Sequence, residues 1–451
     1  MSIHKGLLLD LYELTMAASF FEHKLQPRAT FDLFVRRFPQ QRSFFMACGL
    51  EDALKFLENF SFSPEDLDFL KQKGIFKDNF LDYLEGLRFT GNVYALREGT
   101  IFFPNEPILR LSAPMLEAQL VESYLLNTIN VATTLGSKAA RVVLAAQGKG
   151  VYDFSLRRTQ GWQAGLVASR SSYIAGCSAT SNVLAGKLYG LPIAGTMAHS
   201  FIMSFPDELS SFRAYAESFP DSTTLLVDTY GYKQGIKNAI IAAKELEAKG
   251  CKLRAIRLDS GDLVKISQLA RCLLDKAGLA YVQILASGNL DEFKIEKLLK
   301  EKSAIDNFGV GTNMGVSSDA PYLDVIYKLS QIEDLERKQP VMKLSKDKVT
   351  YPGIKQIFRV SGPKGAYIKD ILALEGEKIK GKPLLEKVME NGKITISLPN
   401  IKEIRNFARD NIQLLPDKYK KLKSKASYPV SLSPGLRQMT LKLRQEIEAR
   451  N

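Results

Sequence analysis

The sequence predicts an α/β fold whose central part is a β/α barrel, preceded by an α+β domain and followed by a C-terminal extension. Three observations support this prediction. Short apolar strand candidates alternate with helical segments between residues 150 and 311. Polar residues or glycines follow the strand candidates directly. The 451 residues exceed one ordinary core and predict two or three domains.

The N-terminal part, residues 1–130, mixes helical segments with short strands. Residues 63–74, SPEDLDFLKQKG, have a serine N-cap signal, an acidic first turn and a terminal glycine, which predict a helix. Residues 89–114 alternate apolar and polar side chains between glycine and proline turns, which predicts a small antiparallel sheet. Residues 115–146 have the apolar period of a helix. We expect these segments to form an α+β domain.

The central part, residues 131–335, carries the β/α alternation. Residues 231–250 and 262–278 are helix candidates. Parallel β/α units open onto one face at the carboxyl ends of a barrel's strands, whereas an open doubly wound sheet binds ligands only around its switch point. A consecutive series of strands with polar ends favours the barrel. The strand candidates are GVYDFSL (150–156), PIAGT (192–196), TTLLVDT (223–229), LRAIRLD (253–259), YVQILAS (281–287) and IDNFGVG (305–311).

The C-terminal part, residues 336–451, departs from this alternation. Residues 342–360 and 392–399 have the character of short strands, and a basic helical tail follows. The basic run over 416–425 is typical of a solvated segment. We expect this part to pack on the other two.

The positive charge leaves two classes of partner open. Lys and Arg number 62 against 49 Asp and Glu, a formal net charge of +13. Such a surface attracts nucleic acid or small polyanionic substrates such as phosphates. The sequence contains no zinc-knuckle spacing, no RNA-recognition aromatic motif and no heptad zipper. The net charge alone therefore does not distinguish nucleic acid from small polyanionic substrates as the partner.

The cysteine pattern and the N-terminus predict a cytoplasmic protein. The four cysteines show no C-x-x-C spacing, which is typical of buried thiols in a reducing compartment. Asp10 and Glu13 interrupt the only apolar patch near the N-terminus, which argues against a signal peptide. No later apolar run reaches the length of a membrane span.

A glycine-rich segment, IDNFGVGTNMG (305–315), predicts a phosphate site. Gly309 and Gly311 free the backbone to turn its N–H groups inward, and Thr312 adds a hydroxyl donor. Barrels often place a phosphate site after their last two strands. The alternative is a plain glycine-rich turn.

The segment AIRLDSGDL (255–263) combines one cation with two carboxylates. Asp259 and Asp262 beside a glycine can hold Mg²⁺ through its waters or bind ribose hydroxyls. Asp262 is equally suited to cap the following helix, and we favour that role for it. Arg257 inside a barrel strand would be a costly buried charge unless it met an anion.

His199 and an arginine pair complete the candidate constellation. Arg157 and Arg158 follow another strand, and only one of them is expected to face the site because neighbouring extended residues point opposite ways. His199 is one of three histidines, follows a strand candidate and has small neighbours. No second internal histidine, cysteine pair or H-E-x-x-H accompanies it, so we predict no metal site there but a nucleophilic or acid/base role.

Eight motifs follow one another along the chain: DLYELTM (10–16), SLRRTQG (155–161), SNVLAGKLYGLPIAGTMAHSF (181–201), LLVDTY (225–230), RLDSGDL (257–263), ASGNLDE (286–292), GVGTNM (309–314) and YPGIKQIFR (351–359). Taken together and in this order, they resemble the nicotinate phosphoribosyltransferase family. The resemblance implies an irregular β/α barrel of the type II phosphoribosyltransferase kind, an additional N-terminal domain and a homodimer with active sites near the interface. It also implies the reaction of nicotinate with 5-phosphoribosyl 1-diphosphate to nicotinate mononucleotide and diphosphate in NAD salvage, coupled to ATP hydrolysis.

The resemblance also implies roles for single residues. His199 is the residue that ATP would phosphorylate transiently, and Tyr12 would pack against nicotinate in the neighbouring subunit's barrel. Thr196 and Arg257 would hold nicotinate, with Arg257 on its carboxylate. Thr312 and the glycines Gly309 and Gly311 would grip the 5-phosphate. Arg157, Ser200 and the catalytic candidate Asp259 occupy further motif positions, the first two on the phosphoribosyl donor.

We expect Mg²⁺ with the ATP and diphosphate substrates, since a cation stabilises the departing diphosphate. Neither nucleic acid nor a membrane is an expected partner. A nicotinamide-directed transferase on the same fold remains the nearest alternative, and a basic nucleic-acid-binding protein is the alternative from another class. An acidic residue or a neutral donor in place of Arg257 would be expected for the amide substrate.

Overall fold

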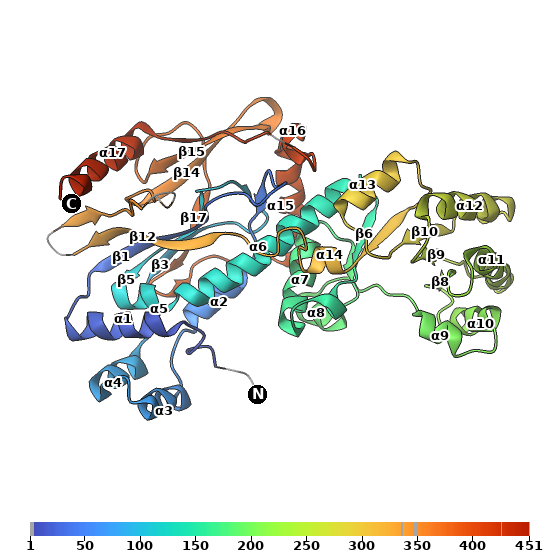
Figure 1. The fold of residues 1–451 in the computed structure, drawn as a ribbon, viewed down its shortest axis with the longest axis horizontal. Coiled ribbons are helices and arrows are strands. Elements are labelled where there is room, and N and C mark those ends of the chain that lie inside the picture. The colour runs from blue at the N-terminus through green and yellow to red at the C-terminus, as the bar shows by residue number, and fades with distance from the viewer. Residues whose placement is uncertain (1–3, 335–336, 346–347, 349, 425, 451) are drawn as a thin grey trace. The chain divides into compact units, whose positions relative to one another are not determined.

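The computed structural model describes residues 4–334, 337–345, 348, 350–424 and 426–450. The chain forms two compact units, one of residues 1–134 and 322–451 and the other of residues 135–321 (Figure 1). The division of the sequence into three parts, with boundaries near residues 130 and 335, stays a prediction. Residues 346–347 and 349 of the expected strand over 342–360, and Lys425 of the basic run, lie outside the described residues.

A seven-stranded sheet forms the centre of the first unit. Its order is β13-β12-β1-β5-β3-β17-β18, so strands from the C-terminal segment extend a sheet that the N-terminal segment begins. β1 lies antiparallel between β12 and β5, and β3 pairs antiparallel with β5, as the sequence of 89–114 predicts. The strands are β1 (Arg28–Val35), β3 (Asn92–Leu96), β5 (Pro107–Pro114), β12 (Val325–Glu333), β13 (Lys338–Pro340), β17 (Leu385–Glu390) and β18 (Lys393–Ile394).

Helices of the N-terminal segment share one hydrophobic core with this sheet. The predicted helix over 63–74 is confirmed as α3, whose capping box joins Ser63 and Asp66. The predicted helix over 115–146 is present as two helices that break at Val121. The helices are α1 (Leu11–Glu22), α2 (Leu50–Glu58), α3 (Pro64–Lys73), α4 (Asp78–Gly86), α5 (Met115–Leu120) and α6 (Glu122–Ala145).

The rest of the first unit contains two smaller sheets and the C-terminal helices. One sheet has the order β16-β14-β15-β19, and β2 pairs with β4 in the other. The strands are β2 (Phe45–Met46), β4 (Ile101–Phe102), β14 (Lys355–Ser361), β15 (Tyr367–Leu374), β16 (Lys382–Pro383) and β19 (Val430–Leu432). The helices are η2 (Pro363–Gly365), α15 (Ile401–Leu414), α16 (Asp417–Lys420) and α17 (Pro434–Glu448).

The second unit is a curled parallel sheet with helices between its strands. The strand order β7-β6-β11-β10-β9-β8 confirms the predicted parallel β/α units. The strands are β6 (Gly150–Asp153), β7 (Ala179–Thr180), β8 (Thr224–Leu226), β9 (Ala255–Leu258), β10 (Gln283–Ala286) and β11 (Asn307–Val310). The helices are η1 (Leu156–Arg158), α7 (Trp162–Ile174), α8 (Val183–Tyr189), α9 (His199–Met203), α10 (Glu208–Ser218), α11 (Tyr232–Ala248), α12 (Leu263–Lys276), α13 (Glu292–Lys300) and α14 (Thr312–Gly315).

One strand prediction was wrong. Residues 192–196 form no strand; Ile193 makes a single parallel bridge to Thr180 in β7. The sequence analysis missed β7 because two residues are too short to show an alternating pattern. Among the described strands, β7 and β8 are the two edges of the sheet, so the described strands form a curled sheet rather than a closed ring.

In the second unit a buried ion-pair network joins α6 to α13, with Lys138 and Arg141 both contacting Glu292, at 2.5 and 3.0 Å. Neither charge of such a pair can be removed alone without a large cost. Within the described part of the chain, no helix is long and apolar enough to cross a membrane.

Candidate active site

The carboxyl ends of β8, β9 and β10 bring polar side chains to one edge of the parallel sheet. The register pairs Arg257 of β9 with Leu226 of β8 and with Leu285 of β10. Residues that follow these strands therefore lie side by side. Asp228, Asp259 and Ser287 occupy these positions.

Arg257 is the centre of this cluster. Its Nε donates to Ser287 Oγ at 2.8 Å, one terminal nitrogen to Thr196 Oγ1 at 2.9 Å and the other to Asp259 Oδ1 at 2.7 Å. The side chain is 15% exposed, and its guanidinium lies 5.7 Å from the centre of the Phe154 ring. Within the described residues, three of its five N–H donors are used in this way, which leaves two for a ligand.

Asp259 joins Arg257 to His199. Its Oδ1 accepts from Arg257 and from the Ser287 hydroxyl, and its Oδ2 lies 3.8 Å from His199 Nε2. Burial raises the pKa of Asp259, but the hydrogen bond from Ser287 and the charge of Arg257 outweigh it, so the pKa lies below its usual range. The carboxylate is therefore ionised at neutral pH.

Asp228 supports the backbone of the same edge. Its Oδ2 accepts from the Asp259 backbone N–H at 2.9 Å and from the Ser260 hydroxyl at 2.7 Å. Its Oδ1 is buried and has no hydrogen-bond partner among the described residues. A buried polar atom without a partner is costly and is typical of a site that meets a ligand, ion or water.

His199 begins the short helix α9 and remains accessible. Its side chain is 40% exposed, and its Nδ1 lies 3.1 Å from the Thr229 hydroxyl. The Thr229 hydroxyl can either accept from or donate to Nδ1, and in the tautomer whose Nδ1–H donates to Thr229, Nε2 carries the free lone pair. This arrangement leaves the Nε2 atom available for nucleophilic chemistry.

Glycines allow the backbones at this edge to approach closely. Gly288 has φ +93°, and a Cβ there would lie 2.0 Å from the Asp259 carbonyl oxygen. A Cβ on Gly309 would lie 2.5 Å from the Phe154 ring and 3.4 Å from Ser287 Cβ. The glycine turn that leads into α14 thus adjoins Phe154 and Ser287.

A buried carboxylate holds the end of β6. Asp153 accepts hydrogen bonds from the Ser155 N–H and hydroxyl, from Ser169 and from Thr180, all within 3.0 Å. These bonds fix the chain just before η1 and Arg157. A carboxylate with this many donors is fully satisfied, so Asp153 positions the loop rather than binding a ligand.

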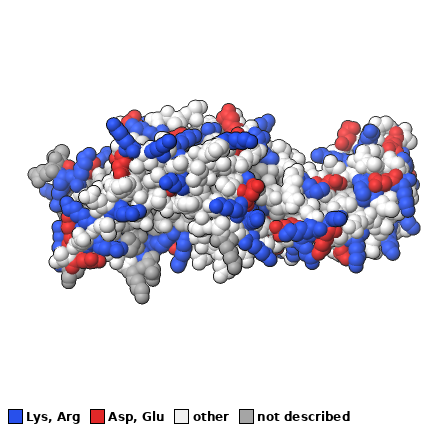
Figure 2. Space-filling model, turned by 90° about the horizontal axis from the view of Figure 1, so that it is seen from above, with Lys and Arg blue, Asp and Glu red and all other residues white. Residues whose placement is uncertain are grey.

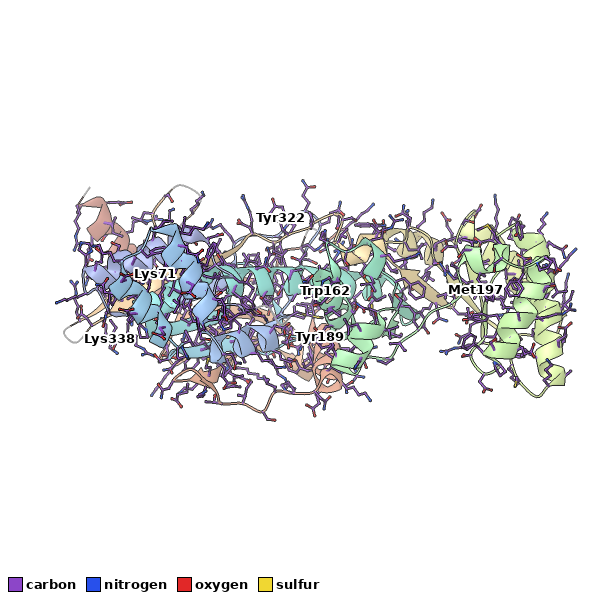
Figure 3. The ribbon with its side chains drawn as sticks, turned by 90° about the horizontal axis from the view of Figure 1, so that it is seen from below. Lys71, Trp162, Tyr189, Met197, Tyr322 and Lys338 are labelled. Atoms are coloured by element: carbon purple, nitrogen blue, oxygen red, sulfur yellow. The ribbon has the colours of Figure 1, made fainter. Side chains whose placement is uncertain are left out.

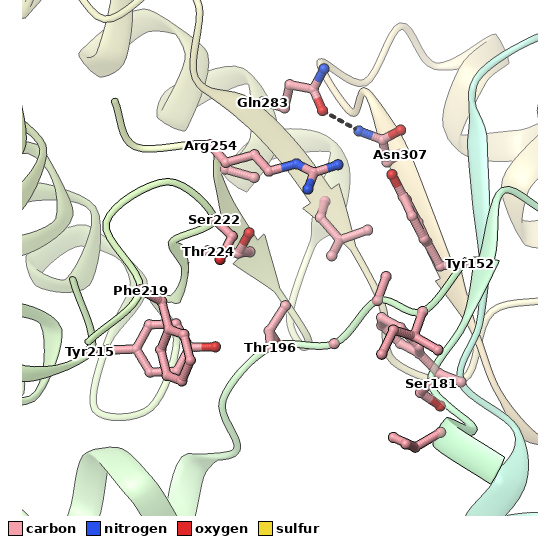
Figure 4. A pocket seen from close by; sticks show the side chains of 17 residues that line it. Tyr152, Ser181, Thr196, Tyr215, Phe219, Ser222, Thr224, Arg254, Gln283 and Asn307 are labelled. Atoms are coloured by element: carbon pink, nitrogen blue, oxygen red, sulfur yellow. Dashed lines mark hydrogen bonds between the residues drawn. The ribbon is translucent and has the colours of Figure 1, made fainter. Parts of the chain in front are cut away.

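A cavity of about 620 Å³ lies on the sheet side that Thr196 faces (Figure 4). Asn307 donates to Gln283 at 2.8 Å on one wall, and Tyr215 and Phe219 form the opposite wall. Its lining is mixed aromatic and polar, which suits a planar ligand with a few polar groups.

Some of the predicted site residues contact one another in the structure, and others do not. Thr196, His199, Arg257 and Asp259 are linked by the contacts above. Gly309, Gly311 and Thr312 lie at the end of β11 and the start of α14, beside Phe154. Arg157, in η1 beside α14, and Ser200, beside His199, are exposed, and the described residues make no side-chain hydrogen bond to either. Tyr12 lies in the first unit.

Tyr12 is 45% exposed on α1. Partial burial, followed by the carboxylates of Glu122 and Glu13, raises its pKa well above the usual range, so the hydroxyl stays protonated.

Sequence reasoning missed several partners of the candidate residues. Thr229, Phe154 and Asp153 touch the site or support it, and the sequence analysis assigned none of them a role. Thr229 ends a strand candidate, so the strand-end rule could have found it, whereas Asp153 and Phe154 lie inside the candidate over 150–156 because the strand in the structure ends at Asp153. Across the described residues, no group of three or more His, Cys, Asp or Glu has the arrangement of a metal site.

Models of one family match most of the chain. The N-terminal domain model of nicotinate phosphoribosyltransferase matches residues 7–130, the family model matches 150–359 and the C-terminal domain model matches 378–440. A nicotinate phosphoribosyltransferase of Mycobacterium tuberculosis is 46% identical over 433 residues, covering 95% of this chain and 92% of the relative. That of Bacillus subtilis is 36% identical over 452 residues, covering 94% and 92%.

Solved structures agree with these matches. The crystal structure of human nicotinic acid phosphoribosyltransferase is similar with a TM-score of 0.86 and 31% identity, covering 97% of this chain and 100% of that one. A nicotinate-nucleotide pyrophosphorylase from Pyrococcus furiosus has a TM-score of 0.75 and 26% identity, covering 92% and 98%.

Proposed function

The chain belongs to the nicotinate phosphoribosyltransferase family, and we propose that it makes nicotinate mononucleotide and diphosphate from nicotinate and 5-phosphoribosyl 1-diphosphate in NAD salvage, with coupled ATP hydrolysis. The observation that carries this proposal is Arg257. A nearly buried guanidinium keeps two free donors at a strand end, beside a cavity with aromatic walls. That arrangement suits a planar acid.

Nicotinate would bind with its carboxylate on Arg257 and Thr196. The Arg257 fork can offer two parallel N–H bonds to a carboxylate, and Asp259 and Ser287 hold the fork in place. A neutral amide would gain less from this charge. The preference for the acid over nicotinamide therefore follows from Arg257.

The phosphoribosyl donor would lie along the glycine turn. Gly309, Gly311 and the Thr312 hydroxyl would bind its 5-phosphate, since bare backbone amides bind phosphate oxygens. Arg157 and Ser200 are exposed near this edge and would contact the donor. In the reaction the bond from the anomeric carbon to diphosphate breaks with its electron pair on the diphosphate. The nicotinate ring nitrogen then forms the new bond to that carbon.

Nε2 of His199 would attack the γ-phosphorus of ATP, so that an N–P bond forms while the P–O bond to the leaving ADP breaks. Water would later cleave the N–P bond and release phosphate, which completes ATP hydrolysis. The exposed imidazole and its contact with Thr229 support this role. A phosphoryl group adds roughly −1.5 to −2 charges. Beside Asp259 that negative charge would repel the Asp259 carboxylate and change its hydrogen bond with Arg257. Phosphorylation by ATP would in this way change the affinity of the site for nicotinate.

Mg²⁺ would accompany ATP and the diphosphate substrates. The chain's own contribution would be the unpartnered Oδ1 of Asp228 and the Oδ2 of Asp259, because carboxylate oxygens are the ligands that Mg²⁺ prefers. When bound, the ion neutralises charge on the diphosphate.

We also propose the homodimer that brings Tyr12 to the neighbouring subunit. Apolar side chains that are about half exposed gather on both units. On the first unit they are Leu8, Leu11 and Tyr12; on the second they are Trp162, Val183, Leu184 and Leu188 (Figure 3 labels Trp162 and, at the end of α8, Tyr189). Exposed apolar groups of this kind are typical of interfaces.

We also propose that the curled parallel sheet of the second unit is the irregular barrel of type II phosphoribosyltransferases. No disulfide joins the cysteines among the described residues, which supports the proposal of a cytoplasmic enzyme.

Figure 2 bears on the nucleic-acid alternative. On the face shown, Lys and Arg are interspersed with Asp and Glu rather than gathered into one continuous stripe. A stripe would be expected for a protein that follows a phosphate backbone. The distribution of charge on this face therefore favours small polyanionic substrates over nucleic acid as the partner of a chain with a net charge of +13.

The test is to incubate the protein with 5-phosphoribosyl 1-diphosphate, Mg²⁺, and nicotinate or nicotinamide, with and without ATP. We expect nicotinate mononucleotide, stimulated by ATP, and little product from the amide. Equal turnover of acid and amide would favour the nicotinamide-directed alternative. Absence of both mononucleotides, with salt-sensitive binding to nucleic acid, would refute the proposed function.

A further inference from the structure

A side-chain amide joins the glycine turn of the candidate active site to the loop that follows β10. Asn313 belongs to α14 and directly follows Thr312. Its Nδ2 donates to Asn289 Oδ1 at 3.0 Å and to the Leu290 carbonyl oxygen at 3.1 Å. We propose, on the basis of the proposed function, that Asn313 is a positioning residue that couples binding of the donor's 5-phosphate to binding of nicotinate.

The hydrogen bonds of Asn313 fix which way its amide faces. Carbonyl oxygens only accept hydrogen bonds, so the NH₂ group of Asn313 must face Asn289 and Leu290. The Oδ1 atom on the other side accepts from the Ser318 hydroxyl at 3.1 Å. Leu290 is 2% exposed, and a buried backbone carbonyl without a donor would be costly. A side chain without an amide could not meet both demands at this place.

The loop over residues 288–290 is held at its two ends by other groups. Before it, the Ser287 N–H donates to the Leu258 carbonyl oxygen at 2.8 Å, which joins the end of β10 to the end of β9. After it, the Asp291 side chain caps α13. The contacts of Asn313 therefore act on the middle of the loop.

The middle of this loop has a backbone conformation that needs support. Gly288 has φ +93° and Asn289 has φ +50°, so two consecutive residues are left-handed. Asparagine tolerates such a φ better than most residues, but it does not favour it as glycine does. Lys294 Nζ, on an exposed side chain, donates to the Asn289 carbonyl oxygen at 2.7 Å. The partly buried Asn313 adds the support that comes from the glycine turn.

The glycine turn is also packed closely against the chain that leads into η1. A Cβ on Gly315 would lie 2.2 Å from Ser155 Cβ, and one on Gly311 would lie 3.2 Å from the Phe154 carbonyl oxygen. Such close packing leaves the turn little room to move on that side. A phosphate held by the turn would therefore restrain, through Asn313, the loop after β10.

The same loop begins at a residue that touches the proposed nicotinate site. Ser287 is 3% exposed, and its Oγ accepts from Arg257 Nε at 2.8 Å. A shift of the loop would move this hydroxyl and with it the Arg257 fork. A path of covalent and hydrogen bonds thus runs from Thr312 and Asn313 to Ser287 and Arg257.

Two ligands that restrain one structural element favour each other's binding. The first ligand orders the element, so less of the conformational entropy cost remains for the second. The donor's 5-phosphate on the glycine turn would hold the loop after β10, and nicotinate would then meet an Arg257 fork that is already in place. The coupling is reciprocal, so nicotinate would tighten binding of the donor by the same factor.

The test measures nicotinate binding to the full-length protein by calorimetry, with and without saturating ribose 5-phosphate. This probe carries the 5-phosphate of the donor but no diphosphate, so no group is transferred during the measurement. The variants are Asn313→Ala, which removes the amide, and Asn289→Gly, which removes the Oδ1 acceptor and tolerates φ +50°. The control is Asn59→Ala, because the Asn59 amide also donates to a carbonyl oxygen, that of Lys55 at 2.8 Å, but in the first unit.

We expect ribose 5-phosphate to lower the Kd of nicotinate at least about fivefold in the wild type and in Asn59→Ala, and less than about twofold in Asn313→Ala. Asn289→Gly should lie between them, because the contact with the Leu290 carbonyl remains. Amide hydrogen exchange over residues 287–291 should slow on adding ribose 5-phosphate in the wild type and not in Asn313→Ala. A loss of folded protein does not change the ratio of the two Kd values, so a merely structural role of Asn313 would leave that ratio unaltered.

A wild-type ratio in Asn313→Ala, or no effect of ribose 5-phosphate on nicotinate binding in the wild type, would overturn the inference even when nicotinate mononucleotide is formed. Formation of the mononucleotide from 5-phosphoribosyl 1-diphosphate is measured separately on each protein. Coupled binding that Asn313→Ala abolishes, in a protein that forms no mononucleotide, would support the coupling and contradict the proposed function.

Discussion

Arg257→Ala gives a direct measure of how nicotinate is recognised. The change removes three hydrogen bonds within the cluster and the two donors that remain for the substrate carboxylate. A hydrogen bond to a charged group contributes about 1.5–3 kcal/mol. Two such bonds, less the readjustment of Asp259 and Thr196, give about 3 kcal/mol. That loss corresponds to a roughly hundredfold weaker affinity for nicotinate.

The assay compares the KM values for nicotinate and for the phosphoribosyl donor, and the ratio of rates with nicotinate and nicotinamide. We expect the loss to fall on nicotinate and the preference for the acid to disappear. Arg257→Lys is the matched control, because lysine keeps the charge and loses the planar fork, and it should retain part of the preference. Equal losses for nicotinate and the donor, or an unchanged preference for the acid, would refute the assignment.

Three further predictions concern other residues. His199→Ala should abolish ATP-dependent labelling by γ-phosphate and the stimulation by ATP while the melting temperature stays; full coupling would contradict its role. Burial raises the pKa of Glu13 to about 7, so the folded state holds a proton that the unfolded state has lost, and stability should fall as pH rises from about 5 to 8. Glu13→Gln should remove that slope in thermal melts, by on the order of 3 kcal/mol at most. Gly288→Ala should lower stability by more than about 2 kcal/mol and impair turnover, because φ is +93° and the new Cβ would meet the Asp259 carbonyl; denaturant titration measures it.

Local patterns explain which parts of the fold were predictable. The Ser63 cap, the apolar period of 115–146 and the β/α alternation are all properties of neighbouring residues, and the structure contains the corresponding elements. The strand-end rule placed Arg257 and Asp259 correctly at one edge because parallel strands align their carboxyl ends. These predictions required no knowledge of which strands pair.

Long-range pairing explains what the sequence left open. β12 and β17 join the N-terminal sheet although they lie more than two hundred residues further along the chain, and no local period encodes that choice. Likewise, Ser287 reaches Arg257 only because β10 is the neighbour of β9, and Thr229 reaches His199 only because α9 lies beside the end of β8. The sequence indicated the strand ends, but it did not indicate which side chain would meet which.

The excess of positive charge shows why composition could not choose a partner. Several cations counted in the +13 are buried in ion pairs: Arg359 with Asp370 at 2.6 Å, Lys138 with Glu292 at 2.5 Å and Lys355 with Asp32 at 2.8 Å. A cation that is buried in an ion pair presents little net field to a ligand, so the number of cations does not say where a ligand would meet positive charge. What a basic chain binds is therefore decided by where its charges stay unpaired, which depends on the fold and not on composition.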